Sequence, residues 1–503
     1  MSDRVQANYL SQLKDCAALL SGSLLPLSFS PFDLWPIAFL APAILFWITF
    51  DSDRYRTMWR FYLFNVGMFS VGISWIFVSI NAYGGASSLL SGMLVLLFVL
   101  TFSLICLPQA WVYAKWLRRN SCATAAAFVG LWVLQEWFRG WFLTGFPWLF
   151  LGYGVMETPL VYLAPLFGIF GVSLAACACS ICFVLAILQL RAVFLILPLL
   201  IIVLSLASGS FTHTSHQKDI TVSLVQGNVD QHTKWLPENR LQILNLYLSA
   251  SASEWGRDLI VWPEAAVTIF RDDAEAKLDE INRHGTKFGT ALMTGIPDVD
   301  ENGEFQNTVL LLGDGSGQYI KRRLVPFGEY VPLEELLRGL IQFFDLPMSR
   351  NKPGPWLQSP LLAGELRLST SICYEVVYPE LVRQSTRAAD LLVTVSNDTW
   401  FGSSIGPWQH IQMARMRAIE NGRSMVRATN NGVTALIDHR GNLQASLPQF
   451  EAGVLRGDIE IRTGSTFFNQ YGSFPCLALC FFLILAAAFR RDWLFWSDGD
   501  VKE

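Results

Sequence analysis

Charged residues are scarce in this sequence. Only 16% of its 503 residues are Asp, Glu, Lys or Arg, against roughly 25% in soluble domains. The formal net charge is −4, and no basic stripe with interleaved aromatic residues occurs, so nucleic acid is excluded as a partner. Because 52% of the residues are hydrophobic, a soluble fold of this length could not bury so much apolar surface. The composition therefore predicts insertion into a membrane.

Cysteine is nearly absent from the polar part of the chain, where Cys373 stands alone. A disulfide framework within that part is therefore excluded. The triplet Cys177, Cys179 and Cys182 has a spacing that resembles a metal cluster, but it lies in an uncharged apolar segment with no histidine nearby. We interpret these cysteines as small helix-packing residues. The six histidines are scattered without ligand spacing, so neither a metal nor an organic cofactor is predicted.

Long apolar runs fill the first 209 residues and return near the end. A bilayer span needs about 20 mostly apolar residues. The sequence predicts about eight spans, the first two short and interrupted by proline, at residues 13–30, 34–50, 60–81, 88–112, 122–142, 160–189, 192–209 and 472–489.

Positive charge alternates between the predicted loops. Arg54 and Arg56 follow the second span and Lys115 and Arg118 follow the fourth, whereas the short loops on the other side have almost no Lys or Arg. Because Lys and Arg favour the cytoplasmic side, both termini are predicted to be cytoplasmic. The expected organisation is then a transmembrane bundle of about seven spans (1–209), an extracytoplasmic domain (210–471), and a last helix with a cytoplasmic tail (472–503).

The large segment 210–471 has the alternation of an α/β domain. Short apolar, β-branched runs predict strands, and 3.6-residue periodicity predicts helices between them. The expected strands are 219–226, 258–263, 290–296, 307–312, 366–372, 389–396 and 433–437, and the expected helices are 237–255, 271–287, 375–386 and 407–421.

Three strand ends in this segment carry residues suited to acyl transfer. Cys373 closes LRLSTSI, where backbone N–H groups and a helix start can hold an oxyanion and favour a thiolate. Glu264 closes DLIVWP, and partial desolvation there is expected to raise its pKa and make it a general base. Lys321 precedes RLVPFGEYVP, and its cation could lower the pKa of a thiol and stabilise an oxyanion. Taken singly, each residue is better interpreted without a catalytic role, as a core cysteine, a capping glutamate and a solvated lysine.

Together these strings resemble the nitrilase (carbon–nitrogen hydrolase) superfamily over residues 219–460. VWPE supplies Glu264, KRRLVPFGE supplies Lys321 with Glu329 as a second glutamate, and SICYE supplies Cys373. The resemblance implies an αββα sandwich in which Glu264, Lys321 and Cys373 form the catalytic triad. The predicted fold is thus an α-helical transmembrane bundle plus a nitrilase-like α/β domain.

A narrower resemblance covers nearly the whole chain. An eight-span bundle with this domain before the last span is similar to the apolipoprotein N-acyltransferase family of bacterial inner membranes. Strings outside the triad also match that family, namely TGFPW at 144–148, VQGN at 225–228, SNDTWFG at 396–402, GPWQHIQMARMRAIE at 406–420 and TNNG at 429–432.

The narrower resemblance implies a ping-pong acyltransferase. A phospholipid would donate its sn-1 acyl chain to Cys373 as a thioester, and the α-amine of a diacylglyceryl-cysteine apolipoprotein would accept it. Glu264 would move the protons, and Lys321 and the backbone N–H of Tyr374 would hold the oxyanion. The resemblance implies a multi-pass protein of the bacterial inner membrane, with its catalytic domain on the periplasmic side. We expect the protein to be a monomer.

Further residues are interpreted with two readings each. Tyr374 and Glu375 flank the nucleophile and could orient substrate or Lys321, and Trp235 could line an acyl entrance or only pack. The stretch 341–348 (IQFFDLPM) could be a membrane-dipping lid or ordinary core. Glu136 is expected to pair with Arg139 or to contact a headgroup. His410 is assigned to packing or to the surface.

Two other functions compete with lipoprotein acylation. A membrane-tethered amidase or nitrilase acting on a small amide would use the same three residues and release its product to water. A transporter or scaffold would show broken spans with buried charge pairs, whereas the predicted spans contain very few ionisable residues. Transfer of an acyl chain to a lipopeptide rather than to water distinguishes the first alternative.

Overall fold

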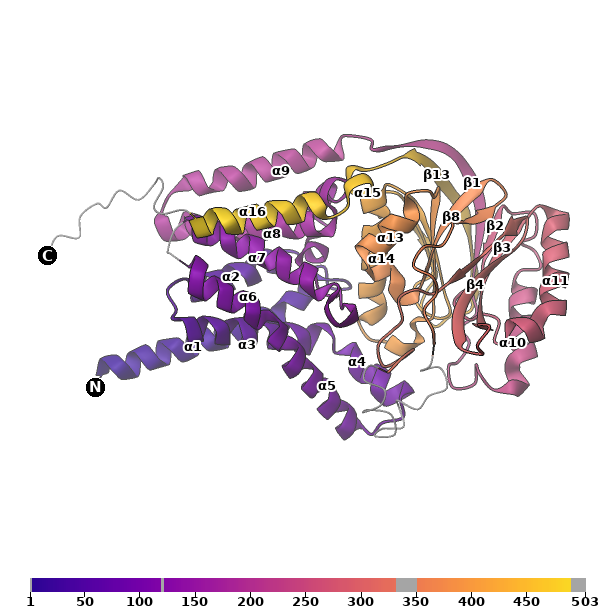
Figure 1. Ribbon diagram of the computed structural model, residues 1–503, viewed down its shortest axis with the longest axis horizontal. Helices are drawn as coiled ribbons and strands as arrows, with labels where there is room; N and C mark the ends of the chain where they lie inside the picture. Colours follow the sequence, from indigo (N-terminus) through magenta and orange to yellow (C-terminus); the bar gives the residue numbers. More distant parts are fainter. Residues whose placement is uncertain (1, 119–121, 332–350, 490–503) are drawn as a thin grey trace.

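The computed structural model describes residues 2–118, 122–331 and 351–489 and contains two parts that lie side by side. Figure 1 shows a bundle of long helices on one side and a layered α/β domain on the other. The helices of the bundle are α1 (Ser2–Leu24), α2 (Pro36–Phe50), α3 (Arg54–Gly72), α4 (Trp75–Val78), α5 (Ser88–Phe102), α6 (Leu107–Val112), α7 (Cys122–Arg139), α8 (Ala164–Gln189), α9 (Ile196–Gly209), α15 (Phe467–Tyr471) and α16 (Phe474–Phe489).

Several of these helices suit a bilayer. Among the described residues, the segments Ser88–Leu117, Pro159–Gln189 and Ala192–Gly209 are long and apolar enough to cross it. A fourth span results if Arg54–Gly72 and Trp75–Tyr83, which meet at a bend of 51°, are counted together. The predicted span 60–81 is therefore not one straight helix. Only 11% of the Ala192–Gly209 window is buried inside the protein. Lipid would cover the exposed remainder of this helix. The chain is a membrane protein, but the predicted count of about eight spans is not confirmed.

Two apolar helices are shorter than a bilayer is thick. Pro36–Phe50 and Phe474–Phe489 have 15 and 16 residues, which correspond to about 23 Å of helix, against a hydrocarbon core of roughly 30 Å. Both were predicted as spans.

The α/β domain contains two sheets packed face to face. The first sheet has the order β13-β1-β2-β3-β4-β6, and the second has the order β12-β11-β10-β9-β8-β7-β5. The strands are β1 (Thr214–Gln226), β2 (Leu259–Val261), β3 (Ala291–Val299), β4 (Phe305–Gly313), β5 (Gly315–Ser316), β6 (Gln318–Ile320), β7 (Leu361–Ala363), β8 (Leu366–Ile372), β9 (Leu391–Ser396), β10 (Met425–Thr429), β11 (Ala435–Ile437), β12 (Leu443–Ser446) and β13 (Gly453–Gly464).

Helices cover both outer faces of the two sheets. Helices α10 (Arg240–Ala250) and α11 (Arg271–Phe288) lie on the first sheet, away from the bundle, and α13 (Pro379–Thr386) and α14 (Gly406–Asn421) lie between the second sheet and the bundle. One apolar cluster, with Val222, Val261 and Leu368 among its members, fills the space between the sheets. This arrangement is the predicted αββα sandwich.

The bundle and the sandwich share a continuous apolar core. Val382 of α13 and Ile411 and Met416 of α14 are buried in the same cluster as the bundle residues Phe46 and Phe150. The chain enters the sandwich from α9 into β1 and leaves it from β13 into α15. These two strands pair antiparallel, with Thr214 opposite Gly464, so the entry and the exit lie together.

All seven predicted strands are confirmed, as β1, β2, β3, β4, β8, β9 and β11. Six strands were missed, namely β5, β6, β7, β10, β12 and β13, and four of these have only two to four residues. Strand β10 contains the fully buried Arg427, and β13 carries four charged residues among its twelve. Charges in a run obscure the apolar pattern from which strands are predicted.

Candidate active site

The three residues of the predicted triad each follow a strand. Strand β2 ends three residues before Glu264, β6 ends directly before Lys321, and β8 ends directly before Cys373. Lys321 Nζ lies 3.1 Å from Glu264 Oε1. Both charges act on the Cys373 thiol, with opposite effects on its pKa. Segments more than fifty residues apart in the chain thus meet at one site.

Glu264 is held by donors from three different segments. Its Oε1 accepts from Lys321 Nζ and, at 2.7 Å, from Asn307 Nδ2, and its Oε2 accepts from the backbone N–H of Asn397 at 2.8 Å. A carboxylate has about four lone-pair positions, so one on Oε2 is left to accept a further proton. A Cβ on Gly295 of β3 would lie 2.4 Å from the backbone nitrogen of Ala265, so only glycine allows β3 to approach this turn so closely.

The ionisation of Glu264 corrects the sequence-based expectation. Burial does act to raise its pKa, as predicted. The charge of Lys321 and the hydrogen bond from Asn307 act in the opposite direction, and the net result is a pKa below the usual value. Glu264 is therefore a carboxylate at neutral pH and can accept a proton.

Lys321 is buried and joins two carboxylates. Its Nζ lies 2.8 Å from Glu329 Oε1 in addition to its contact with Glu264, and the side chain is only 1% exposed. These two charges raise its pKa despite burial. Glu329 Oε2 also accepts from the backbone N–H of Val325. An ammonium group has three N–H bonds, so one remains for a substrate oxygen.

Cys373 occupies a strained position at the end of β8. Its φ is +52°, in the left-handed region that costs a residue other than glycine about 1–2 kcal/mol. Burial and the charge of Glu264 raise the pKa of its thiol, and Lys321 only partly offsets them. Lys321 therefore lowers the thiol pKa, as predicted, but the net shift is upward. A protonated thiol beside an ionised carboxylate requires that the proton move as the sulfur attacks.

Glu375 fastens the Lys321 segment to the nucleophile turn. It is fully buried, and it accepts from the backbone N–H groups of Arg322 (2.7 Å), Arg323 (3.1 Å) and Ile372 (2.8 Å) and from the Tyr319 hydroxyl (2.9 Å). Of the roles considered from the sequence, orientation of the Lys321 segment agrees with these contacts, whereas the buried carboxylate has no free face toward a substrate.

Glu375→Gln is expected to lower the free energy of unfolding by about 2–4 kcal/mol, because its amide N–H₂ would face donors and leave buried N–H groups unpaired. Thermal unfolding in detergent measures this change. Glu365→Gln, on an exposed turn, is the matched control. Equal stability of the two variants would contradict this account of Glu375.

Tyr374 connects the nucleophile turn to the bundle. Its hydroxyl donates to the carbonyl oxygen of Gly145 at 3.1 Å, and Tyr378 donates to the same oxygen at 3.0 Å. The Tyr374 ring stacks near Trp148, with centroids 6.4 Å apart. The TGFPW segment of the bundle thus borders the site, as its place among the matching strings suggested.

Trp235 is connected to the predicted base Glu264 by the neighbouring residue Lys234. Lys234 is fully buried, and its Nζ donates to the backbone carbonyl of Glu264 at 3.2 Å and lies 5.9 Å from the centre of the Trp235 ring. Burial lowers the pKa of Lys234 to about 8. The Trp235 indole N–H has no hydrogen-bond partner among the described residues. Its proposed place at an acyl entrance stays a prediction.

Two interpretations of side chains need correction. Glu136 does not pair with Arg139; it accepts from Trp132 Nε1 and the Leu151 backbone N–H, while Arg139 donates to the carbonyl of Leu149. His410 is 1% exposed, so of its two interpretations the surface role is wrong, whereas packing agrees with its burial. The two corrections have the same cause. Both side chains contact buried polar groups from distant segments of the chain, and the local sequence around Glu136 and His410 does not reveal these partners. The predicted lid 341–348 lies outside the described residues.

Asn307 and Asn397 belong to the site and were not selected from the sequence. Asn397 directly follows β9, which pairs parallel to β8, so it ends at the same sheet edge as Cys373. That position in the string SNDTWFG is the signal that could have found it. Asn307 lies inside β4 and has no comparable signal.

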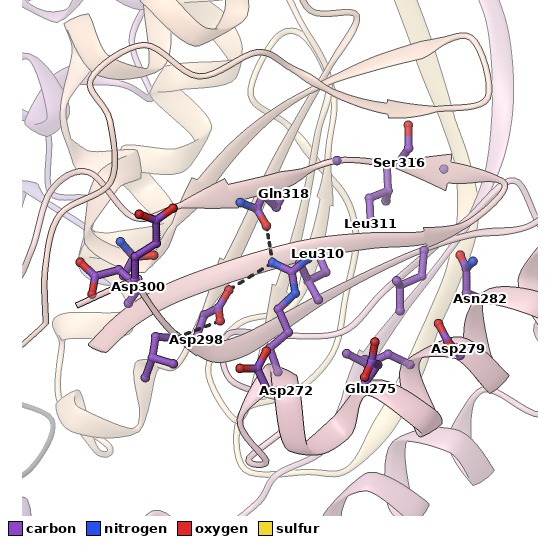
Figure 2. A pocket seen from close by; sticks show the side chains of 18 of the residues that line it. Asp272, Glu275, Asp279, Asn282, Asp298, Asp300, Leu310, Leu311, Ser316 and Gln318 are labelled. Carbon is purple, nitrogen blue, oxygen red and sulfur yellow. Dashed lines mark hydrogen bonds and ion pairs between the residues drawn. The ribbon is translucent and has the colours of Figure 1, made fainter. Parts of the chain in front are cut away.

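A large cavity elsewhere does not contain the triad. It has a volume of about 1100 Å³, lies between α11 and β4, and is lined by carboxylates that include Asp272, Glu275, Asp279 and Asp300 (Figure 2). Arg271 donates to Asp298 and Gln318 there. None of the strand-end residues discussed above lines this cavity, so it is not the candidate active site.

Comparison with protein families agrees with the division into bundle and sandwich. Residues 21–182 match the family described as the apolipoprotein N-acyltransferase N-terminal domain, and residues 221–466 match the carbon–nitrogen hydrolase family.

Curated proteins are also similar to this chain over nearly its whole length. An apolipoprotein N-acyltransferase from Pseudomonas syringae pv. tomato is 44% identical over 93% of this chain and 94% of its own, and one from Azotobacter vinelandii is 43% identical over 94% of each chain. Among solved structures, Saccharomyces cerevisiae Nit3, of the nitrilase superfamily, matches with a TM-score of 0.38 and 19% identity over 49% of this chain and 91% of its own.

Proposed function

The chain belongs to the apolipoprotein N-acyltransferase family, and from this premise we propose that Cys373 carries the acyl group between two lipid substrates. The protein is an acyltransferase of lipoprotein maturation. The observation that carries the proposal is the contact of Lys321 with Glu264 at 3.1 Å, beside a thiol whose pKa both charges influence. These are the parts that a thioester mechanism needs.

In the first half-reaction, Cys373 attacks the sn-1 ester of a phospholipid. The thiol proton passes to Glu264 as the C–S bond forms, and the free N–H of Lys321 and the backbone N–H of Tyr374 hold the oxyanion. The ester C–O bond then breaks, and Glu264 returns the proton to the departing oxygen. A lysophospholipid leaves, and the acyl chain remains on Cys373.

In the second half-reaction, the α-amine of a diacylglyceryl-cysteine apolipoprotein attacks the thioester. Glu264 accepts the proton of the attacking amine, the C–S bond breaks, and the proton returns to the sulfur. The product is an N-acylated lipoprotein and free enzyme. Glu329 contributes by holding Lys321, and Glu375 by holding the backbone on either side of the site.

Access by lipids, rather than by bulk water, follows from the neighbours of the nucleophile. The rings of Tyr374 and Trp148 stack, and both lie in the apolar core that the bundle shares with the sandwich. A thioester in such surroundings is shielded from hydrolysis. Trp235 is proposed to extend this shielding along the acyl path.

The proposed organisation is a bundle (1–209), a periplasmic catalytic domain (210–471) and a final helix with a tail (472–503), with about eight spans in a bacterial inner membrane. The start of α1 and the end of α16 lie on the side of the bundle away from the sandwich (Figure 1), which supports two cytoplasmic termini opposite the catalytic domain. The partners are the phospholipid, the apolipoprotein and the bilayer, and the chain is proposed to act as a monomer.

The test uses detergent-solubilised protein, a phospholipid labelled in its sn-1 acyl chain, and a diacylated lipopeptide with a free α-amine. We expect labelled lipopeptide and lysophospholipid, and, without acceptor, protein heavier by one acyl chain that hydroxylamine removes. An N-acetylated lipopeptide is the control acceptor. Release of the label only as free fatty acid would instead support the membrane-tethered hydrolase.

A further inference from the structure

A buried histidine contacts the backbone of the nucleophile. His410 lies on α14, and its Nε2 is 3.2 Å from the carbonyl oxygen of Cys373. A carbonyl oxygen can only accept a hydrogen bond, so Nε2 carries the proton in this contact. The ring faces the backbone of Cys373, which is unsuitable for a general base acting on the thiol but suitable for holding the residue in place.

Two buried charged side chains orient the His410 ring. Its Nδ1 lies 3.0 Å from both Asp398 Oδ1 and Arg427 Nη2, and Arg427 Nη2 lies 2.7 Å from Asp398 Oδ2. Because Nε2 carries the proton, Nδ1 of the neutral ring accepts from Arg427 Nη2, and Asp398 acts on the ring by holding this guanidinium through Oδ2. Burial and the charge of Arg427 lower the pKa of His410, which favours this neutral form. All three side chains are at most 1% exposed, which makes their mutual pairing obligatory.

The same network reaches the other side of Cys373. Ser396 donates to Asp398 Oδ1 at 2.6 Å, and the same side chain acts to lower the pKa of the Cys373 thiol. A Cβ on Gly432 would lie 2.4 Å from Asp398 Oδ2, so the carboxylate has no room to turn. The side chains of His410, Asp398 and Ser396 therefore act on both the backbone carbonyl and the thiol of Cys373.

The helix that carries His410 is also bound to the bundle. Its neighbour Gln409 accepts from Trp148 Nε1 at 2.7 Å and donates to the carbonyl of Gly72 at 3.2 Å. The His410 ring itself lies 6.1 Å from the Trp148 ring and 5.8 Å from the Phe401 ring. The contact with Cys373 is thus held from the sandwich and from the bundle.

Cys373 needs such support because its backbone is in the left-handed region, which persists only where the surroundings enforce it. We propose that His410 is a positioning residue: its Nε2–H, oriented by Asp398 and Arg427, holds the Cys373 carbonyl and keeps the sulfur aligned with Glu264 and the substrate ester. The inference rests on the proposed role of Cys373 in acyl transfer.

The test compares His410→Ala and His410→Gln in the full-length protein in detergent. Without the donor, the single-turnover rate of acyl-enzyme formation should fall about 10²-fold, the size expected for a small misplacement of a reacting group, with KM for the phospholipid unchanged. Glutamine carries an N–H₂ group that can reach the same carbonyl and should recover most of the loss. His439→Gln, at a partly buried histidine near Glu460, is the control and should have no effect.

A second readout needs no lipid. Alkylation of Cys373 by iodoacetamide, located by peptide mass, should slow in His410→Ala and recover in His410→Gln. If the alanine variant does not fold, Asp398→Asn, which keeps the ring but removes the carboxylate beside it, is expected to slow both reactions.

The outcomes separate the two proposals. Equal rates in wild type and folded His410→Ala would overturn the positioning role, as would a loss that glutamine does not recover and that follows the melting temperature. Absence of any thioester in the wild type would reject the proposed function, while the alkylation series would still decide whether His410 positions Cys373.

Discussion

Cys373→Ala is expected to lower acyl transfer to a lipopeptide by at least about 10⁴-fold, the scale of losing a catalytic nucleophile. The reason is chemical: without the sulfur, no covalent intermediate can form, and the two half-reactions cannot be separated in time. Intact-mass analysis of the variant after incubation with phospholipid should show no added acyl chain, and lysophospholipid should not accumulate.

The control for this variant is Cys16→Ala, at an exposed cysteine of α1, which should keep full activity. Both proteins should unfold at similar temperatures, because a half-buried sulfur contributes little packing. An active Cys373→Ala protein, or an acyl group found on another cysteine, would remove the basis of the mechanism.

Glu264→Gln is expected to lower the single-turnover rate of acyl-enzyme formation by about 10²–10⁴-fold, the usual contribution of a general base. The substitution keeps the shape of the side chain but removes the proton acceptor. It also removes one of the two carboxylates that pair with Lys321, so the melting temperature is measured alongside the rate.

The same substitution should make the thiol more acidic. The negative charge of Glu264 raises the pKa of Cys373, whereas Lys321 lowers it. Loss of the carboxylate therefore lowers the thiol pKa, and the pH profile of iodoacetamide alkylation should shift to lower pH. Acyl transfer and alkylation at fixed pH are thus expected to change in opposite directions.

Glu365→Gln, on the exposed turn between β7 and β8, should change neither reaction. If alkylation and acyl transfer fell together in Glu264→Gln, the electrostatic coupling inferred from the geometry would be wrong, and a folding defect would be the better explanation.

Much of the fold could be predicted because local patterns determine it. Apolar β-branched runs produced all seven predicted strands, and the position of Glu264 and Cys373 after two of them could be seen in the sequence. The short strand β6 before Lys321 was not among the predicted strands. Glu264 and Lys321 follow strands of the first sheet and Cys373 follows a strand of the second, so the three residues meet because the two sheets pack face to face. The strands β10 and β13 escaped prediction because their arginines and acids interrupt the apolar pattern.

Charge states could not be predicted in the same way. Desolvation of Glu264 is a local property and was anticipated, but Lys321 comes from 57 residues away, and Asn307 from 43. Their contacts reverse the direction of the pKa shift. Likewise, the helix pattern left packing and a surface role open for His410, and only the structure placed Asp398, Arg427 and Cys373 around its buried ring.

The sequence by itself determined which segments are apolar, which residues follow strands, and which family's motifs are present, because these depend on neighbours along the chain. Only the tertiary structure decided that Glu264 is ionised, that Cys373 is protonated in a left-handed turn, and that His410 holds its carbonyl. Ionisation and strain depend on the groups that surround a residue in space, and those groups come from segments whose approach no local pattern records.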